Sequence, residues 1–179
     1  MRLRLPGNWR KALAAVLALV MVLFIAATAR LLVWPEQGMP ASVSAIVLLA
    51  GPGDRMPVAL RLASEHRARV LVVSQGAHGY GSPCPPKIPG VELICFDPDP
   101  ADTRGEAEFV GRLANQYRWT SLVLVVSRPQ ATRARILMER CFNGPVYVGT
   151  APLPRSSWPY QIAYGWGALV KALAVHRAC

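Results

Sequence analysis

Residues 122–141 read LVLVVSRPQATRARILMERC, and this stretch decides the fold. Its first part is a run of valine and leucine without polar alternation, which is the pattern of a strand buried on both faces. After Ser127-Arg128-Pro129-Gln130, apolar residues recur at helical spacing, at Ala134, Leu137, Met138 and Cys141. A buried strand that leads directly into a helix is the repeating unit of a parallel sheet.

The same alternation continues on both sides of this stretch. Strands are predicted at 44–49, 70–73, 91–96, 122–126 and 145–149, and helical patterns at 56–63, 103–117, 134–141 and 161–175. Residues 76–90 carry no helical pattern and are expected to form a long irregular loop between two strands. The sequence therefore predicts an α/β domain with a mostly parallel sheet.

The N-terminal segment 12–29 is 18 residues long and uncharged. As a helix it would span about 27 Å, close to the apolar core of a bilayer. Four basic residues precede it, which predicts a cytoplasmic N-terminus. An uncleaved anchor is favoured because the apolar run is long for a signal peptide, but a secretory signal cleaved after Ala27-Thr28-Ala29 is the alternative. We divide the chain into an anchor (1–34), a linker (35–42) and an exported domain (43–179).

Charge and cysteine usage agree with export. Five of the 20 basic residues precede residue 31, where no acid occurs, so the rest of the chain is only mildly basic. No nucleic-acid-binding motif and no cofactor fingerprint is recognised, so neither partner is expected. The pairings Cys84–Cys95 and Cys141–Cys179 are the favoured hypothesis among the three that four cysteines allow. A zinc site that includes His78 is disfavoured, because the spacing matches no common ligand pattern.

Small and polar residues follow four of the predicted strands. Ligands of open parallel sheets bind beyond the carboxyl ends of the strands, where small residues admit backbone amides and arginines offer paired donors. We therefore expect a site for a phosphate or a carboxylate, with Arg104 and Arg128 as further candidate donors. The expected ligand contacts are Gly51, Gly53, Arg55, Ser74, Gly76, Thr103, Ser127, Gln130 and Arg133.

Two of these motifs also have purely structural explanations. Thr103-Arg104-Gly105-Glu106 fits a capping box with Thr103 at the N-cap, and composition alone favours that interpretation over a catalytic one. Ser127 fits the N-cap of the helix that Pro129 helps to start.

Four stretches taken in order, SAIVLLAGPGDR, LVVSQG, DTRGEA and LVLVVSRPQATRAR, resemble the motifs of the SanA/YdcF/ElyC-like family. The family pattern runs roughly D-A-I-V-V-L-G-G-G…R, S-G-G, N-T-x-E-N-A and V-T-S-x-x-H-x-x-R-A. The similarity covers residues 43–150. It implies a Rossmann-like three-layer sandwich behind one transmembrane helix, and a place in the bacterial envelope.

The match to the family is partial. Ser44 stands at the leading Asp, Gln75 in the middle of S-G-G, Gln130 at the histidine, and the acid has moved by one position to Glu106. These departures weaken the case for acid–base chemistry, whereas the retained arginine favours binding. The matching residues are Gly51, Gly53, Arg55, Ser74, Gly76, Thr103, Ala107, Ser127, Arg133 and Ala134.

Two classes of function remain open at this stage. The first is an enzyme that acts on a phosphorylated or lipid-linked cell-wall precursor, with Arg55 and Arg133 holding the anion and Glu106 or Asp102 accepting a proton. The second is a non-catalytic module that binds an envelope ligand or partner, and a plain scaffold is the third alternative. All of them place the domain on the extracytoplasmic side of a bacterial cell membrane.

Overall fold

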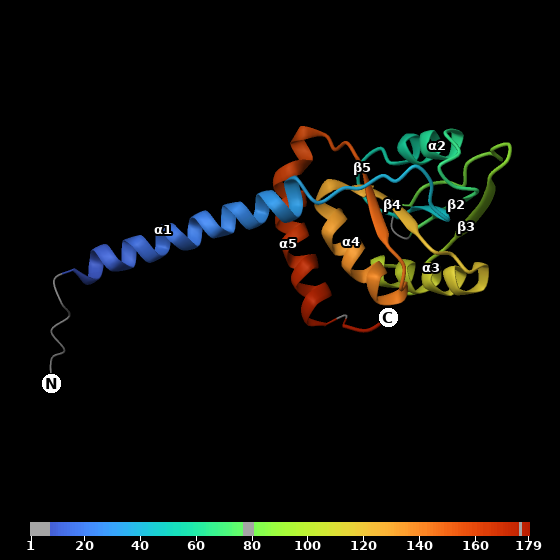
Figure 1. The fold of residues 1–179 in the computed structure, drawn as a ribbon. Coiled ribbons are helices and arrows are strands. Elements are labelled where there is room, and N and C mark those ends of the chain that lie inside the picture. The colour runs from blue at the N-terminus through green and yellow to red at the C-terminus, as the bar shows by residue number, and fades with distance from the viewer. Residues whose placement is uncertain (1–7, 77–80, 176) are drawn as a thin grey trace.

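The computed structural model describes residues 8–76, 81–175 and 177–179. Five strands form one all-parallel sheet in the order β3-β2-β1-β4-β5 (Figure 1). The strands are β1 (Ala45–Leu48), β2 (Val70–Ser74), β3 (Glu92–Phe96), β4 (Leu122–Ser127) and β5 (Val146–Ala151). Each lies within two residues of its predicted position, so the predicted parallel α/β fold is confirmed.

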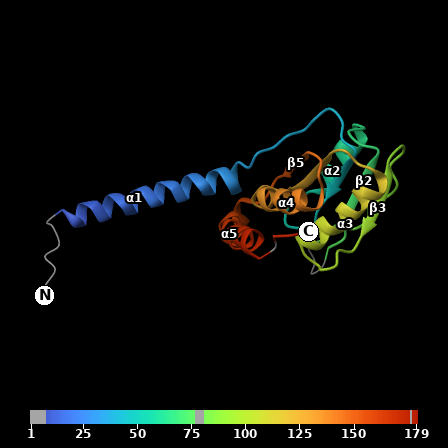
Figure 2. The same cartoon turned by 60° about the horizontal axis from the view of Figure 1, so that its bottom comes forward.

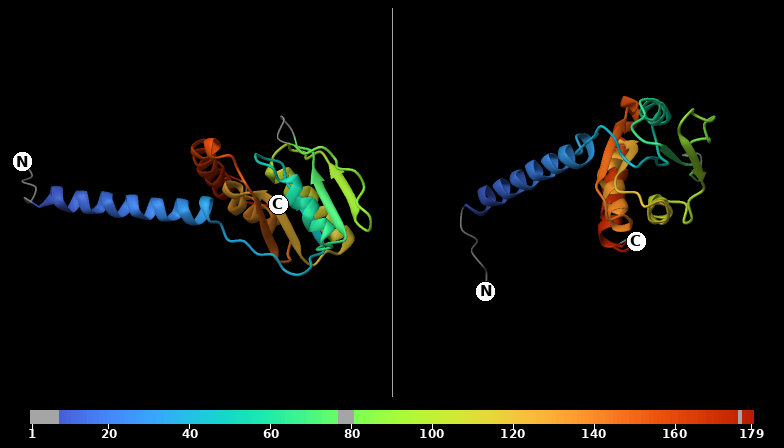
Figure 3. Two further views of the ribbon diagram at one scale, coloured as in Figure 1. Left: turned by 90° about the horizontal axis from the view of Figure 1, so that it is seen from above. Right: turned by 45° about the vertical axis from the view of Figure 1, so that its right-hand side comes forward.

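Helices cover both faces of the sheet, which is why the central strands are apolar throughout. Helix α2 (Met56–Ser64) packs on the face of β1 that carries Ile46 and Leu48. Helices α3 (Thr103–Tyr117) and α4 (Arg128–Cys141) pack on the opposite face (Figure 3). This arrangement is a three-layer sandwich of the Rossmann-like kind.

The strand order reverses next to β1. From β1 the chain proceeds outward through β2 to β3, then returns to the other side of β1 to form β4 and β5. The loops after β1 and β4 therefore diverge at the carboxyl edge of the sheet, where α/β proteins bind ligands.

The described residues between β2 and β3, 75–76 and 81–91, form no helix. In the described part of this connection, residues 81–91, Ile88 and Val91 pack against the core on the α2 side. A disulfide joins Cys84 of the loop to Cys95 of β3, as predicted. His78 lies outside the described residues.

The C-terminal helix α5 (Trp158–Ala174) follows the short helix η2 (Arg155–Ser157) and packs against α4. A second disulfide, Cys141–Cys179, ties the last residue of the chain to the end of α4, which confirms the second predicted pairing. The side chain of Arg140 donates to the carbonyl oxygen of Ala172 at 2.8 Å, so it joins α4 to α5.

The N-terminal helix projects from the domain. Helix α1 (Trp9–Thr28) continues into the π-helical segment η1 (Ala29–Val33). The domain is contacted by η1, where Leu32 is buried, and by the C-terminal turns of α1, while the rest of α1 projects away from it (Figure 2). Among the described residues, Trp9–Val33 is the one segment long and apolar enough to cross a membrane, with a mean hydropathy of 2.7. A membrane anchor and a signal sequence both have these properties.

Two helical glycines give a matched test of the packing between α3 and α4. A Cβ at Gly111 would lie 2.6 Å from the carbonyl oxygen of Cys141, whereas a Cβ at Gly167 would have no neighbour within 4 Å. We expect Gly111→Ala to lower the free energy of unfolding by about 1–3 kcal/mol through overpacking. Gly167→Ala should raise it by roughly 0.5–1 kcal/mol through helix propensity.

Denaturant unfolding of the full-length chain in detergent micelles measures both changes. Equal effects of the two substitutions would mean that α3 and α4 are not in close contact at Gly111.

Candidate functional site

A cavity of ≈ 290 Å³ opens at the carboxyl edge of the sheet, beside the point where the strand order reverses. The loop after β1, the N-terminal turns of α3 and α4, and the first turns of α5 form its walls. Seven of the residues expected at a site line it: Gly51, Gly76, Asp102, Thr103, Glu106, Gln130 and Arg133. The remaining four, Gly53, Arg55, Ser74 and Ser127, lie near this edge but do not line the cavity.

Gln130 packs tightly over Gly51 at the mouth of the β1 loop. A Cβ at Gly51, whose φ is +149°, would lie 2.1 Å from Nε2 of Gln130, so another residue there would be strained and would displace the Gln130 amide. Oε1 of Gln130 accepts a hydrogen bond from the Ser127 hydroxyl at 2.9 Å, and Nε2 donates to the carbonyl oxygen of Ala50 at 3.4 Å. Ser127 therefore occupies the N-cap position of α4, as expected, but its side chain holds Gln130 instead of capping the helix.

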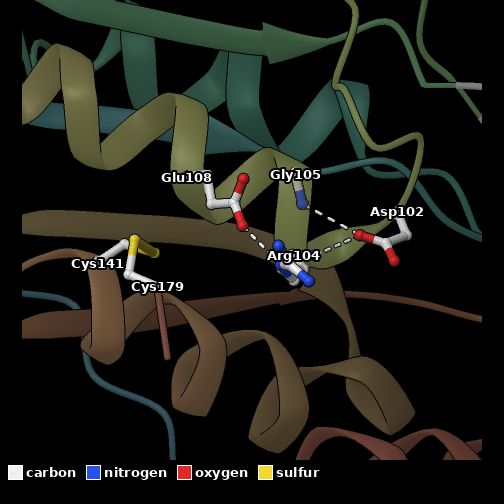
Figure 4. The surroundings of a disulfide bond; sticks show 6 residues. All are labelled: Asp102, Arg104, Gly105, Glu108, Cys141 and Cys179. Atoms are coloured by element: carbon white, nitrogen blue, oxygen red, sulfur yellow. Dashed lines mark hydrogen bonds and ion pairs between the residues drawn. A yellow bond between two sulfur atoms is a disulfide. The ribbon is translucent and has the colours of Figure 1, made fainter. Parts of the chain in front are cut away.

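The predicted capping box is wrong. The N-cap of α3 is Asp102, not Thr103, and its Oδ1 accepts hydrogen bonds from the backbone N–H of Arg104 at 2.9 Å and of Gly105 at 3.0 Å (Figure 4). The helix thus begins one residue earlier than a box requires. That shift rotates Glu106 past the capping position, so that it points inward.

Glu106 is buried at the base of the cavity and only 2% exposed. Its Oε1 accepts a hydrogen bond from the backbone N–H of Ala50 at 2.6 Å, which links α3 to the end of β1. Burial raises the pKa of the carboxyl group to about 7, against the opposing effects of Ser74, the Ala50 N–H, Arg55 and Arg133.

The Ser74 hydroxyl lies close enough to Glu106 to lower the pKa of its carboxyl group. It is fully buried, yet it makes no hydrogen bond of standard geometry with the described residues. The carboxyl group and this hydroxyl form a buried polar pair at the end of β1 and β2.

Arg55 acts behind the cavity wall. It is 4% exposed and donates through Nη1 to the carbonyl oxygen of Leu49 and through Nε to that of Gly53 at 3.4 Å. Burial lowers the pKa of its guanidinium to about 10, while the charge of Glu106 opposes that shift. Arg55 therefore stays protonated at neutral pH, fixes the β1 loop from inside, and places a positive charge near Glu106.

Arg133 is the only residue with a permanent positive charge among the described residues that line the cavity. Its guanidinium lies 5.7 Å from the ring centroid of Tyr164, and its charge lowers the pKa of Glu106. Arg128, by contrast, is exposed and does not line the cavity. Arg104 forms an ion pair with Glu108, four residues later on α3, at 2.6 Å (Figure 4).

A second cavity of ≈ 390 Å³ adjoins the first between α3 and α5. The two share Arg133 and Tyr164 in their linings, and the second adds Arg104 and Lys171. Three basic residues thus line the two adjoining cavities, and Asp102 lines both.

Sequence reasoning missed the contribution of α5. Tyr160, Gln161 and Tyr164 line the first cavity, although they lie within α5 and do not directly follow a strand end. Tyr160 and Tyr164 are four residues apart and their rings stack at 6.1 Å, so they share one helix face. That spacing is visible in the sequence, but a Tyr pair at helical spacing more often marks packing than a ligand site.

Comparison of the chain with protein-family models, curated proteins and solved structures finds no match.

Proposed function

We propose that this protein is a membrane-anchored protein of the bacterial envelope whose α/β domain binds an anionic ligand in the cavity at the carboxyl edge of the sheet. The observation that carries the proposal is the position of Arg133. It lines a cavity at the switch point of the sheet, next to a buried carboxyl group whose pKa lies near 7. The resemblance of residues 43–150 to the SanA/YdcF/ElyC-like family is consistent with this proposal.

The adjoining cavity supports a ligand with more than one anionic group. Lys171 lines the second cavity beside Arg133, as does Arg104, which is paired with Glu108, and Asp102, the acid at the junction, has Oδ1 engaged in capping α3. Arginine matches the geometry of phosphate and carboxylate groups with paired donors. A phosphorylated or lipid-linked cell-wall precursor fits this chemistry.

Export is supported by the N-terminal helix and by the disulfides. All four cysteines are paired, and disulfides persist in oxidising compartments outside the cytoplasm. An uncleaved α1 would keep the domain at the membrane surface, with the N-terminus in the cytoplasm.

Catalysis by Glu106 is a second candidate function, and the pKa of this residue favours it. A carboxyl group with a pKa of about 7 exchanges a proton readily at neutral pH, which is the requirement for a general acid or base. Glu106 and Arg133 line the same cavity. An anion bound to the arginine would therefore lie in the cavity that the carboxyl group faces. In this function Glu106 would activate water for attack on a bound phosphate ester.

Arg133→Ala tests anion binding. Removal of a charged hydrogen-bond donor costs about 1.5–3 kcal/mol, so we expect the affinity for the anion to fall by roughly 10- to 100-fold. The measurement is the shift of the thermal unfolding midpoint of the full-length chain in micelles, with inorganic phosphate, pyrophosphate and a polyprenyl phosphate as ligands. A ligand that binds the native state raises the midpoint.

Arg128→Ala is the matched control, because Arg128 lies in the first turn of the same helix but is exposed and does not line the cavity. It should retain the wild-type shift. Equal shifts in wild type and Arg133→Ala would place the bound anion elsewhere. No shift with any of the three ligands would remove the anion-binding proposal, and release of phosphate that Glu106→Gln abolishes would establish the catalytic function.

A further inference from the structure

Helix α5 exposes apolar side chains on the side that faces α1. Val170 and Leu173 are 58% and 51% exposed, and they follow Trp166 at spacings of four and seven residues. These three residues therefore share one helix face. We call this face, Trp166, Val170 and Leu173, the α5 stripe.

The α5 stripe contacts the N-terminal helix at one end. The ring of Trp166 stacks on that of Phe24 with centroids 5.3 Å apart, and its Nε1 donates to the Thr28 hydroxyl at 3.0 Å. Leu32 packs against Gly165, the residue that precedes Trp166. One end of the α5 stripe thus contacts the last turns of the apolar helix, while Val170 and Leu173 extend beyond that contact.

The orientation of α5 relative to α1 is compatible with a position on the membrane surface. In Figures 1 and 3, α5 runs across the end of α1 and lies on the side of the domain from which α1 departs. If α1 crosses a bilayer, a helix that runs across its end lies roughly in the plane of the membrane surface.

The charge of this part of the chain suits anionic lipid headgroups. Residues 140–179 contain no Asp or Glu, but they contain Arg140, Arg155, Lys171 and Arg177. Lys171 is exposed on α5, where it also lines the second cavity. A helix with exposed apolar residues and only basic charges is typical of a segment that lies in the membrane interface.

We propose that α5 is an interfacial helix, docked through the α5 stripe on the bilayer that α1 spans. This inference rests on the membrane anchor of the proposed function. It has a consequence for the ligand site, because Tyr160 and Tyr164 of the same helix line the cavity. The cavity then opens at the level of the lipid headgroups, where a lipid-linked anion reaches Arg133 without leaving the membrane.

The test uses spin labels on the full-length chain, with both disulfides intact, in vesicles of phosphatidylethanolamine and phosphatidylglycerol. Val170→Cys reports on the α5 stripe, Val20→Cys on α1, and Gln116→Cys on an exposed position of α3, away from the stripe. All three positions are exposed, so the labels leave the core intact. For each label one measures the ratio of accessibility to oxygen, which is enriched in the bilayer, to that of a water-soluble nickel chelate.

We expect the ratio at position 170 to exceed that at position 116 severalfold and to approach that at position 20. A low ratio at 170 with a high ratio at 20 would overturn the docking of α5 while leaving the anchor in place. Low ratios at both positions would overturn the anchor itself, and with it the premise of the inference. Dipolar broadening at 170 that grows with the protein-to-lipid ratio would show that a second copy of the chain, not the bilayer, covers the α5 stripe.

Discussion

Glu106→Gln is expected to abolish a loss of stability that the wild-type protein undergoes as pH rises from about 4.5 to about 8. The pKa of the buried carboxyl group is raised to about 7 in the folded protein, from an ordinary value of 4.5. The unfolded chain therefore releases this proton at lower pH than the folded chain does. Stability from this group is fully present below the ordinary pKa and is lost as pH rises through the folded value.

The size of this effect follows from the shift. Each unit of pKa difference corresponds to about 1.4 kcal/mol, so the wild-type protein should lose roughly 3 kcal/mol across this window. Glutamine keeps the size of the side chain and an acceptor for the Ala50 N–H, but it does not titrate. The variant should therefore show a flatter profile and become the more stable protein at the alkaline end.

Urea unfolding of the full-length chain in micelles at several pH values measures both profiles. Glu108→Gln is the matched control, because it makes the same change two residues later, where the carboxylate is partly exposed and pairs with Arg104. Such a pair contributes about 0–1 kcal/mol, so this variant should keep the wild-type shape of the profile. If Glu106→Gln also keeps the wild-type pH profile, burial does not raise the pKa of the Glu106 carboxyl group. The proposed role of Glu106 in proton transfer would then be wrong.

Removal of the Cys141–Cys179 disulfide should produce the largest loss of stability of any change considered. The bond spans 38 residues, and closing a loop of that length in the unfolded chain is worth about 4 kcal/mol in the chain-entropy model. Stabilities of whole domains are about 5–15 kcal/mol, so a Cys141→Ala/Cys179→Ala variant should be strongly destabilised. Denaturant unfolding without reductant gives the difference.

Removal of the other disulfide is the control that shows which part of the structure is destabilised. Cys84–Cys95 spans 11 residues at the far end of the sheet, and its removal should cost about 3 kcal/mol. Only the loss of Cys141–Cys179 should speed amide hydrogen exchange in α5, because that bond and the Arg140 contact with Ala172 join α5 to α4. Equal exchange of α5 in both variants would mean that packing alone holds the helix.

Much of the fold was predictable because its signals are local. The short apolar runs predicted all five strands, and the signal is clearest for β1, β2 and β4, which are buried along their whole length. The cysteine pairing favoured among the three possible ones was also correct. The boundaries of α5 were less accurate, and its start at Trp158 precedes the predicted one by three residues.

The site was predictable in part. The rule that ligands lie beyond the carboxyl ends of parallel strands brought Gly51, Gly76 and Arg133 to one cavity. The rule could not tell which arginine faces that cavity. Arg55 and Arg133 both follow strand ends, but one is turned inward to backbone carbonyls and the other lines the wall.

By itself, the sequence determined the parallel α/β fold, the apolar N-terminal helix and the edge of the sheet where polar residues gather. These properties depend on patterns within a few residues, which secondary structure and burial impose directly. Tertiary structure decided that Glu106 meets Ala50 instead of its own helix terminus, and that α5 supplies Tyr160 and Tyr164 to the cavity. Both results depend on how far a helix is rotated and against what it packs, and contacts between residues distant in the chain set these quantities.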